Sequence, residues 1–288
     1  TVHTDTIETP YLVGVWVRDT DGTLIATDAE TEPISVPPGR YNLEMSTVPM
    51  KVYLFVDGGV RVDETDDRIR LTFTETRTVT VGVRSLHEHP AATITTTDDP
   101  TDLMRAISAF GSALKTTSCE RAFRSLRGHP PLLDLGDRLD IPTHLDTPDT
   151  GVRITVPPTY ESIYPVASLA YYLGATVEPG DDPALYADGH RTSLTAHGGF
   201  ESTVATVLQH LFVMDCLTRT EGYYPVDLHE RTLLDPHLDL DVADLYDKPL
   251  AQQVRAYLSV PFDTVADAIP QWKLTADVRP RPAHARTL

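Results

Sequence analysis

Lysine, cysteine and long apolar runs are all scarce in this 288-residue sequence. Only four lysines accompany twenty arginines, and these 24 bases face 42 acids, for a formal net charge of -18. This balance argues against nucleic-acid binding, because counterion release from phosphates needs lysine and arginine on the surface. No run of 18 apolar residues occurs, so we expect no membrane-spanning helix, and no secretory signal is visible.

The two cysteines, Cys119 and Cys216, are far apart in sequence and suggest no disulfide framework, which fits a reducing cytosol. A Lys-poor, Thr-rich acidic surface suits concentrated salt, where carboxylates hold hydrated cations and the Debye length falls to about 3 Å at 1 M. We therefore predict a cytoplasmic, haloarchaeal protein. Because the sequence starts at Thr1 without methionine, we also expect a fragment of a longer protein.

Residues 11–84 alternate between apolar and polar side chains with the period of a β-strand. Turn signals interrupt the alternation at Asp21-Gly22, at Pro37-Pro38-Gly39 and at Asp57-Gly58-Gly59. This spacing predicts seven or eight short antiparallel strands in a β-sandwich or barrel, and we favour a sandwich-like domain over residues 1–95.

The pattern then changes to a helical one. Asp98 or Asp99 is a candidate N-cap before Pro100, and apolar residues recur at helical spacing beyond it. We predict a helical connector over residues 96–150, with a linker at its end. Residues 151–288 alternate short strands with helices, ending in a strand over KLTADVRP, and this favours an α/β domain. The predicted class is therefore mixed α+β.

Residues 112–131, named the basic island below, concentrate positive charge in this acidic chain. Arg121, Arg124 and Arg127 are spaced to share one side of a helix, and Lys115 precedes them. They could pair with carboxylates of the next domain or of a partner, or they could bind an anionic ligand. We favour carboxylate pairing, because acids are plentiful in the same chain.

A reactive thiol is a second candidate. Cys119 lies among the cations of the basic island, close in sequence to His129, and cations favour the thiolate. A structural cysteine is the competing interpretation, and we favour it. Cys216, near the end of an apolar helix, is expected to be partly buried.

A third candidate is a metal site at His87 and His89, whose H-x-H spacing places both imidazoles on one side of a strand. No further ligand follows from the sequence, and surface hydrogen bonding is the simpler role. No P-loop and no G-x-G-x-x-G motif occurs. The acidic cluster DPHLDLDVADLYD is interpreted as a solvated face. We therefore expect no cofactor.

Three stretches carry a family resemblance: residues 81–131, from VGVRSLHEHP to RSLRGHPP; residues 151–185, GVRITVPPTYESIYPVASLAYYLGATVEPGDDPAL; and residues 215–230, DCLTRTEGYYPVDLHE. They resemble the N-terminal region of uncharacterised haloarchaeal proteins, some of which carry a C-terminal CHAT domain, a caspase-like peptidase. The resemblance implies that such a peptidase follows beyond Leu288. It carries no catalytic residue over, because neither cysteine ends an apolar strand and His129 precedes two prolines.

These observations predict a non-catalytic recognition or regulatory module, which senses a protein partner or restrains a peptidase domain in cis. Two alternatives stay open. One is a cysteine-dependent hydrolase that uses Cys119, and the other is a structural or assembly protein. Thiol reactivity distinguishes the first alternative, and concentration-dependent mass distinguishes the second.

Overall fold

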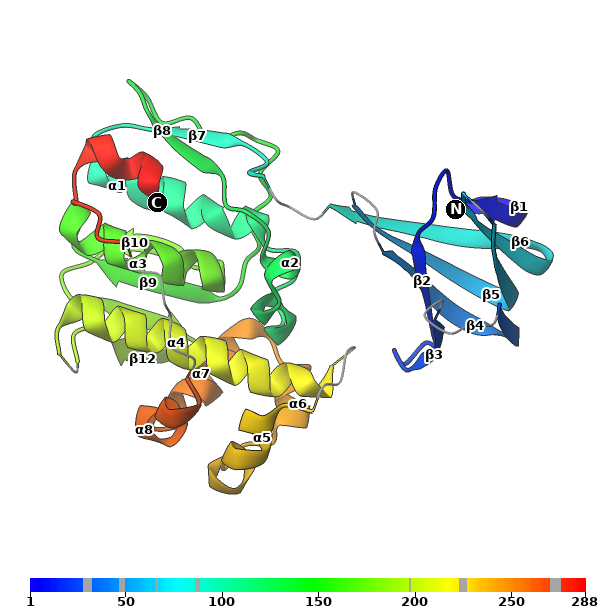
Figure 1. Ribbon diagram of the computed structural model, residues 1–288. Coiled ribbons are helices and arrows are strands. Elements are labelled where there is room, and N and C mark those ends of the chain that lie inside the picture. The colour runs from blue at the N-terminus through cyan, green and yellow to red at the C-terminus, as the bar shows by residue number, and fades with distance from the viewer. Residues whose placement is uncertain are drawn as a thin grey trace. The chain divides into compact units, whose positions relative to one another are not determined.

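A computed structural model of residues 1–288 describes residues 1–27, 33–46, 50–65, 67–85, 89–196, 198–222, 227–269 and 276–288. The chain divides into two compact units, an N-terminal unit over Thr1–Leu86 and a C-terminal unit over His87–Leu288 (Figure 1). The region suggested as a connector, residues 96–150, lies within the second unit. Together the two units are mixed α+β, as the sequence predicts.

One six-stranded antiparallel sheet makes up the N-terminal unit, with strand order β1-β6-β5-β4-β2-β3. It is barrel-like, where the sequence suggested a sandwich-like pairing. Its strands are β1 (Val2–Glu8), β2 (Gly14–Arg18), β3 (Leu24–Thr27), β4 (Ile34–Ser46), β5 (Met50–Glu64) and β6 (Ile69–Ser85).

The prediction of seven or eight short strands is wrong, because two expected turns lie inside long strands. The β4–β5 register shifts between Val36 and Gly39, and the β5–β6 register shifts between Phe55 and Val60. Gly39 pairs with Gly58, whose φ of 155° disfavours a side chain. These irregularities act as β-bulges, which bend a strand without ending it.

The bends allow one face of the sheet to enclose a core. Side chains from four of the six strands, β2, β4, β5 and β6, are fully or nearly fully buried there, including Val15, Leu43, Val56, Leu71 and Val79, each 0% exposed. Burying a side chain of this size contributes about 1.5–3 kcal/mol. The alternation that predicts strands thus also selects the face that is buried.

In the C-terminal unit, a four-stranded sheet has the order β10-β9-β11-β12. Strands β9 and β10 are parallel and connected by helix α3 (Tyr160–Leu173), whereas β11 is antiparallel to both β9 and β12. A separate parallel pair joins β7 to β8. The strands are β7 (Thr93–Thr96), β8 (Leu132–Leu135), β9 (Val152–Val156), β10 (Thr176–Pro179), β11 (Ala184–Ala187) and β12 (His190–Ser193).

Helices pack around this sheet, with α1 along β10 and α3 against α4 (Figure 1). The α-helices are α1 (Pro100–Ser108), α2 (Arg124–Arg127), α3 (Tyr160–Leu173), α4 (Phe200–Thr218), α5 (His229–Leu234), α6 (Val242–Tyr246), α7 (Leu250–Ser259) and α8 (Phe262–Val265). The 3-10 helices are η1 (Ala109–Ala113), η2 (Cys119–Ala122), η3 (Arg219–Glu221), η4 (Asp235–His237), η5 (Ala266–Ala268) and η6 (Pro282–Thr287).

Local signals in this unit mark the helix ends well. The Asp99 carboxylate accepts a hydrogen bond from the Thr101 N–H and caps α1 ahead of Pro100, which confirms one of the two predicted caps. Gly174 ends α3 with a φ of 54°, as expected for a C-terminal glycine. The predicted final strand is wrong for residues 276–280, which form none, and its first residues lie outside the described part of the chain.

Residues 96–150 contribute to the core of the C-terminal unit and are not a surface connector. Leu103, Ile107 and Phe110 are at most 2% exposed and pack with α3, α4 and β9 in one apolar cluster. The expected linker after the basic island contains strand β8. Apolar positions that repeat at helical spacing favour burial, and here they place α1 and η1 in the core.

Candidate functional site

The basic island does not form one helix. Arg121 lies in η2 and Arg124 and Arg127 lie in α2, and Phe123 between them is extended, with a ψ of 126°. The three arginines therefore do not share a helical side, and the expected row is wrong on this point. The reason is local, because two residues of this segment, Phe123 and Gly128, adopt non-helical backbone angles.

Arg121 is completely buried and pairs with Asp215 of α4. Its Nη2 lies 2.7 Å from Oδ2 and 3.0 Å from Oδ1 of that carboxylate, and both side chains are 0% exposed. Its Nη1 donates to the carbonyl oxygens of Thr117 and Ser118. A buried guanidinium with this many acceptors fixes the basic island against α4.

Tyr172 completes the buried network. Burial raises the pKa of its hydroxyl well above the usual value, so the hydroxyl stays protonated and donates to Asp215 Oδ2 at 2.5 Å. Burial also raises the pKa of Asp215 to about 6, against the lowering effect of Arg121 and Tyr172. The carboxylate is therefore ionised at neutral pH and balances Arg121.

The other cations of the basic island differ in environment. Arg127 donates to the carbonyl oxygens of Arg121 and Ala122 and lies over the ring of Tyr172, with 5.8 Å from its Cζ to the ring centroid. Arg124 and Lys115 are exposed. Carboxylate pairing is therefore seen for Arg121, and it takes place inside the C-terminal unit.

Both thiols are in environments that disfavour the thiolate. Cys119 is 0% exposed, and burial together with the nearby Asp215 and Glu120 raises the pKa of its thiol to about 12. Burial raises the pKa of Cys216 to about 11. His129 Nδ1 contacts the carbonyl oxygen of Pro130 at 2.9 Å. The geometry assembles no activated thiol from these groups.

We expect Cys119 to react with iodoacetamide at pH 7 roughly a hundredfold or more slowly than free cysteine, because both exposure and thiolate are lacking. Mass spectrometry of the labelled native chain measures the rate. Labelling of the unfolded chain is the control, and there both cysteines should react. Native labelling faster than free cysteine would instead support the hydrolase alternative.

The metal candidates are only partly described. His89 is exposed, and His87 lies outside the described residues. Within the described ranges, no group of three or more histidine, cysteine or acidic side chains is arranged to hold a metal ion. Members of the acidic cluster have structural contacts: Asp235 pairs with Arg231, Asp241 caps α6, and Asp244 pairs with Lys248.

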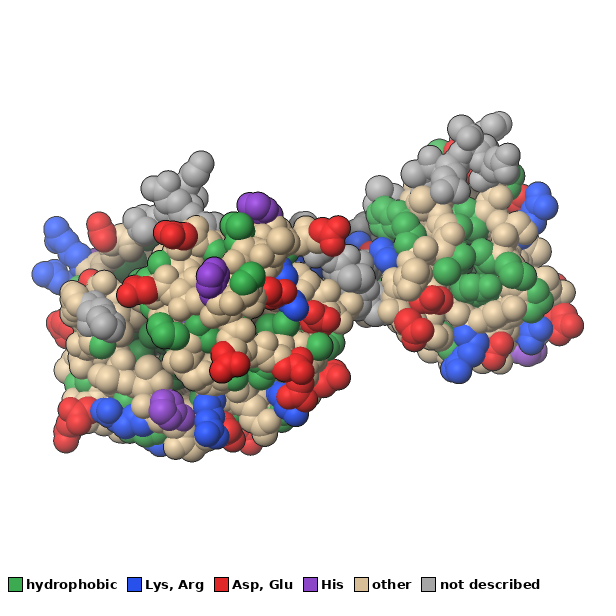
Figure 2. Space-filling model, turned by 90° about the horizontal axis from the view of Figure 1, so that it is seen from below, with side chains coloured by type: hydrophobic (Ala, Val, Ile, Leu, Met, Phe, Trp, Pro, Cys, Tyr) green, Lys and Arg blue, Asp and Glu red, His purple; other side chains and the backbone are tan. Residues whose placement is uncertain are grey.

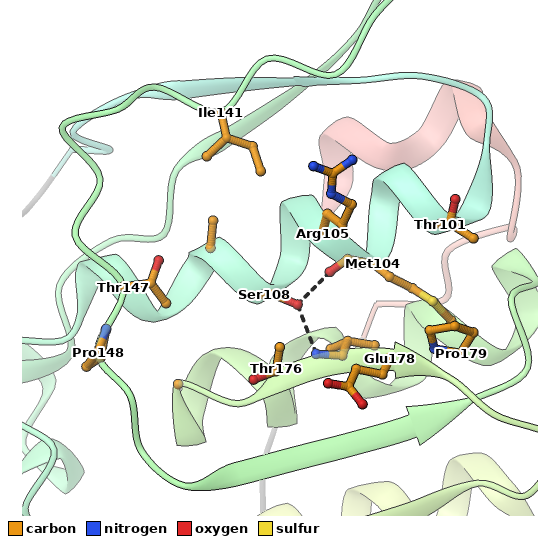
Figure 3. A pocket seen from close by; sticks show the side chains of 13 residues that line it. Thr101, Met104, Arg105, Ser108, Ile141, Thr147, Pro148, Thr176, Glu178 and Pro179 are labelled. Carbon is orange, nitrogen blue, oxygen red and sulfur yellow. Dashed lines mark hydrogen bonds between the residues drawn. The ribbon is translucent and has the colours of Figure 1, made fainter.

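A hollow of about 510 Å³ lies between α1 and β10 (Figure 3). Its floor is the edge strand β10, whose outward-facing backbone is not free to pair with another strand. The N–H of Val177 donates to Ser108 Oγ at 2.9 Å, and Ser108 Oγ–H donates to the carbonyl of Met104. Two residues on, Pro179 has no N–H to offer. This edge is protected against strand pairing, as natural sheet edges usually are.

A larger concavity of about 690 Å³, named the apolar groove, lies in the N-terminal unit. It is bounded by β1, by the segment after β1 and by the inner face of β5 and β6. Three polar side chains in its lining already have partners within the unit: the hydroxyls of Thr4 and Thr9 donate to backbone carbonyls, and Glu8 pairs with Arg70. The lining includes Val2, Tyr11, Met50, Val52, Leu54 and Val81.

Apolar side chains on this unit are unusually exposed. Val83 is 64% exposed, Val2 47%, Met50 45% and Val81 39%. Figure 2 shows hydrophobic side chains gathered on one face of the N-terminal unit, whereas charged side chains are scattered over the visible face of the C-terminal unit. An apolar concavity of this size is the common form of a binding site, so the apolar groove is the candidate functional site.

Sequence patterns did not predict this site. The alternation in β5 and β6 identifies the inner face of the sheet. It does not show at which residue of a strand the other segments cease to cover that face. Comparisons with protein families, with curated proteins and with solved structures returned no match for this chain. Among the described residues, no helix is long and apolar enough to span a membrane.

Proposed function

We propose that this chain is a non-catalytic recognition module whose N-terminal unit binds an apolar segment of a protein partner in the apolar groove. The observation that carries the proposal is that the apolar side chains on the inner face of β6 become more exposed toward the end of the strand. Val79 is 0% exposed, Val81 39% and Val83 64%, and all three belong to the same face. Exposed contiguous apolar surface favours an interaction site over a solvated one.

The environments of the cations and thiols in the C-terminal unit support the non-catalytic part of this proposal. The basic island is held by the Arg121–Asp215 pair, and both thiols have raised pKa values. The resemblance to the N-terminal region of CHAT-containing haloarchaeal proteins adds a candidate role: the module would restrain or direct a caspase-like peptidase carried on the same polypeptide.

Nile red, a neutral fluorophore that brightens in apolar surroundings, tests the groove directly. The full chain should increase its emission, and Val81→Asp should reduce that increase to about half or less, because a carboxylate then lines the groove. Ile25→Asp is the matched control, since Ile25 is 48% exposed on β3 and does not line the groove. Equal emission from both variants would contradict the proposal.

A further inference from the structure

Strand β6 is paired on both sides for most of its length, but its last part has only one neighbour. The β1–β6 ladder ends where Val2 meets Val79, while the β5–β6 ladder continues to the Met50–Ser85 pair. Among the described residues, no strand pairs with the other side of residues 80–85. Alternate residues there direct their N–H and C=O groups outward, where they can receive another strand.

The side chains of this open edge are apolar on the inner face. Val81 pairs with Leu54 and Val83 pairs with Val52, so these valines extend the core face along the strand. Their exposure rises toward the strand end, from 39% at Val81 to 64% at Val83. A strand added to this edge would cover them with its own apolar side chains.

The outer face of the same edge has one cation. Arg84 lies between Val83 and Ser85 and points to the opposite face, where its Nη2 contacts the Tyr53 hydroxyl at 3.4 Å. Within the described residues it forms no ion pair, and its enclosed Nε–H has no acceptor. A carboxylate on an added strand, at a position opposite or diagonal to Arg84, would pair with the positive charge of its guanidinium group.

The C-terminal unit offers a useful contrast. On the open side of its edge strand β10, the Val177 N–H already donates to Ser108, and Pro179 has no N–H. Residues 80–85 contain no proline, and no hydrogen bond to their backbone from a side chain is found among the described residues. A second copy of this chain fits the open edge poorly. If two β6 strands paired antiparallel about Gly82, Arg84 would face Thr80, and residues 80–85 contain no carboxylate.

We propose that residues 80–85 of β6 accept an extended peptide strand from a partner protein, with the pattern apolar–acidic–apolar. The two apolar side chains cover Val81 and Val83, and the acidic side chain between them pairs with Arg84. This proposal rests on the proposed recognition function, because the added strand closes the apolar groove beside Val2 and Met50. It specifies the ligand as a β-strand, held mainly by backbone hydrogen bonds.

Two acetylated and amidated heptapeptides test the pattern, Thr-Thr-Val-Glu-Val-Thr-Thr and the same peptide with lysine in place of glutamate. Titration calorimetry with the full chain, at the lowest salt that keeps it folded, should show the glutamate peptide binding about tenfold more tightly, because lysine opposes Arg84. Arg84→Glu should reverse this preference. Arg61→Glu is the matched control, because Arg61 is exposed on β5, outside the groove, where β4 and β6 already pair on both sides.

Hydrogen exchange locates the bound strand. The glutamate peptide should slow exchange at alternate amides of residues 80–85, and β3 should be unaffected. Absence of binding, or an unchanged preference in Arg84→Glu, would overturn the proposal. So would sedimentation equilibrium that shows a dimer dissociated by Val83→Lys, since the occupant would then be a second copy. Nile red emission that still depends on Val81 would leave the recognition function standing in each of these cases.

Discussion

Replacing Arg121 with methionine is expected to lower the free energy of unfolding by about 3–5 kcal/mol. The guanidinium and the Asp215 carboxylate are both 0% exposed and 2.7 Å apart. Methionine fills similar space but leaves a buried carboxylate without its counter-charge, although the Tyr172 hydroxyl still donates to it. Because whole domains are stable by about 5–15 kcal/mol, a loss of this size is a large share of the total.

Urea unfolding in molar salt, followed by circular dichroism, measures the loss. The double variant Arg121→Met with Asp215→Leu removes both charges together, and we expect it to recover most of the stability. Arg124→Met is the surface control and should change the free energy of unfolding by less than about 0.5 kcal/mol. If Arg121→Met were as mild as this control, the buried pair would not fix the basic island.

His210 is expected to make the C-terminal unit sensitive to acid. Its side chain lies on α4, is 4% exposed and packs edge-on against Phe262, with 5.9 Å between ring centroids. Burial lowers the pKa of the imidazole from 6.5 to about 4. The unfolded chain therefore binds more protons than the folded chain between these values, and up to about 3 kcal/mol of stability is lost as the pH falls from 6.5 to 4.

Asp215 acts with the opposite sign in an overlapping range. Its pKa rises from 3.8 to about 6 on folding, so the folded chain binds the extra proton and gains stability as the pH falls through about 6. A comparison of variants separates the two groups. His210→Phe should remove the acid-induced loss that belongs to the imidazole and leave the contribution of Asp215 in place.

Unfolding by urea at several pH values between 4 and 7 gives the required difference. The stability of His210→Phe minus that of the parent chain should increase as the pH decreases. Ala205→Ser, at an exposed position of the same helix, is the control and should show a difference that does not depend on pH, because neither side chain titrates in this range. A constant difference for His210→Phe as well would show that the imidazole takes up its proton without cost.

Local signals in the sequence predicted the structure correctly where the interaction involves only residues that are adjacent or nearly adjacent in the chain. Asp99 caps α1, and Gly174 ends α3, because capping and a left-handed φ depend on neighbouring residues only. The same kind of signal failed at Gly39 and Gly58. There the two glycines face each other across neighbouring strands, and the pairing turns two apparent loop signals into bulges.

The basic island shows a similar limit. Helical spacing of Arg121, Arg124 and Arg127 is visible in the sequence. Whether each side chain is buried, and which group it pairs with, depends on the residues that pack against it. Asp215 is 94 residues away from Arg121 in the sequence. Long-range charge pairing is set by how α4 packs on η2, which no local pattern contains.

The order of residues by itself determined the mixed α+β class, the division between a strand-rich first part and a helical second part, and the ends of the clearest helices. Tertiary structure alone decided which strands are bent, which arginine is buried and where the inner face of β6 is left uncovered. The reason is that alternation and helical spacing act over a few residues, whereas burial depends on whether a distant segment covers the same surface. Val79 and Val83 have the same side chain and lie on the same face of β6. Strand β1 pairs with β6 as far as Val79, which is buried, and it ends before Val83, which is exposed.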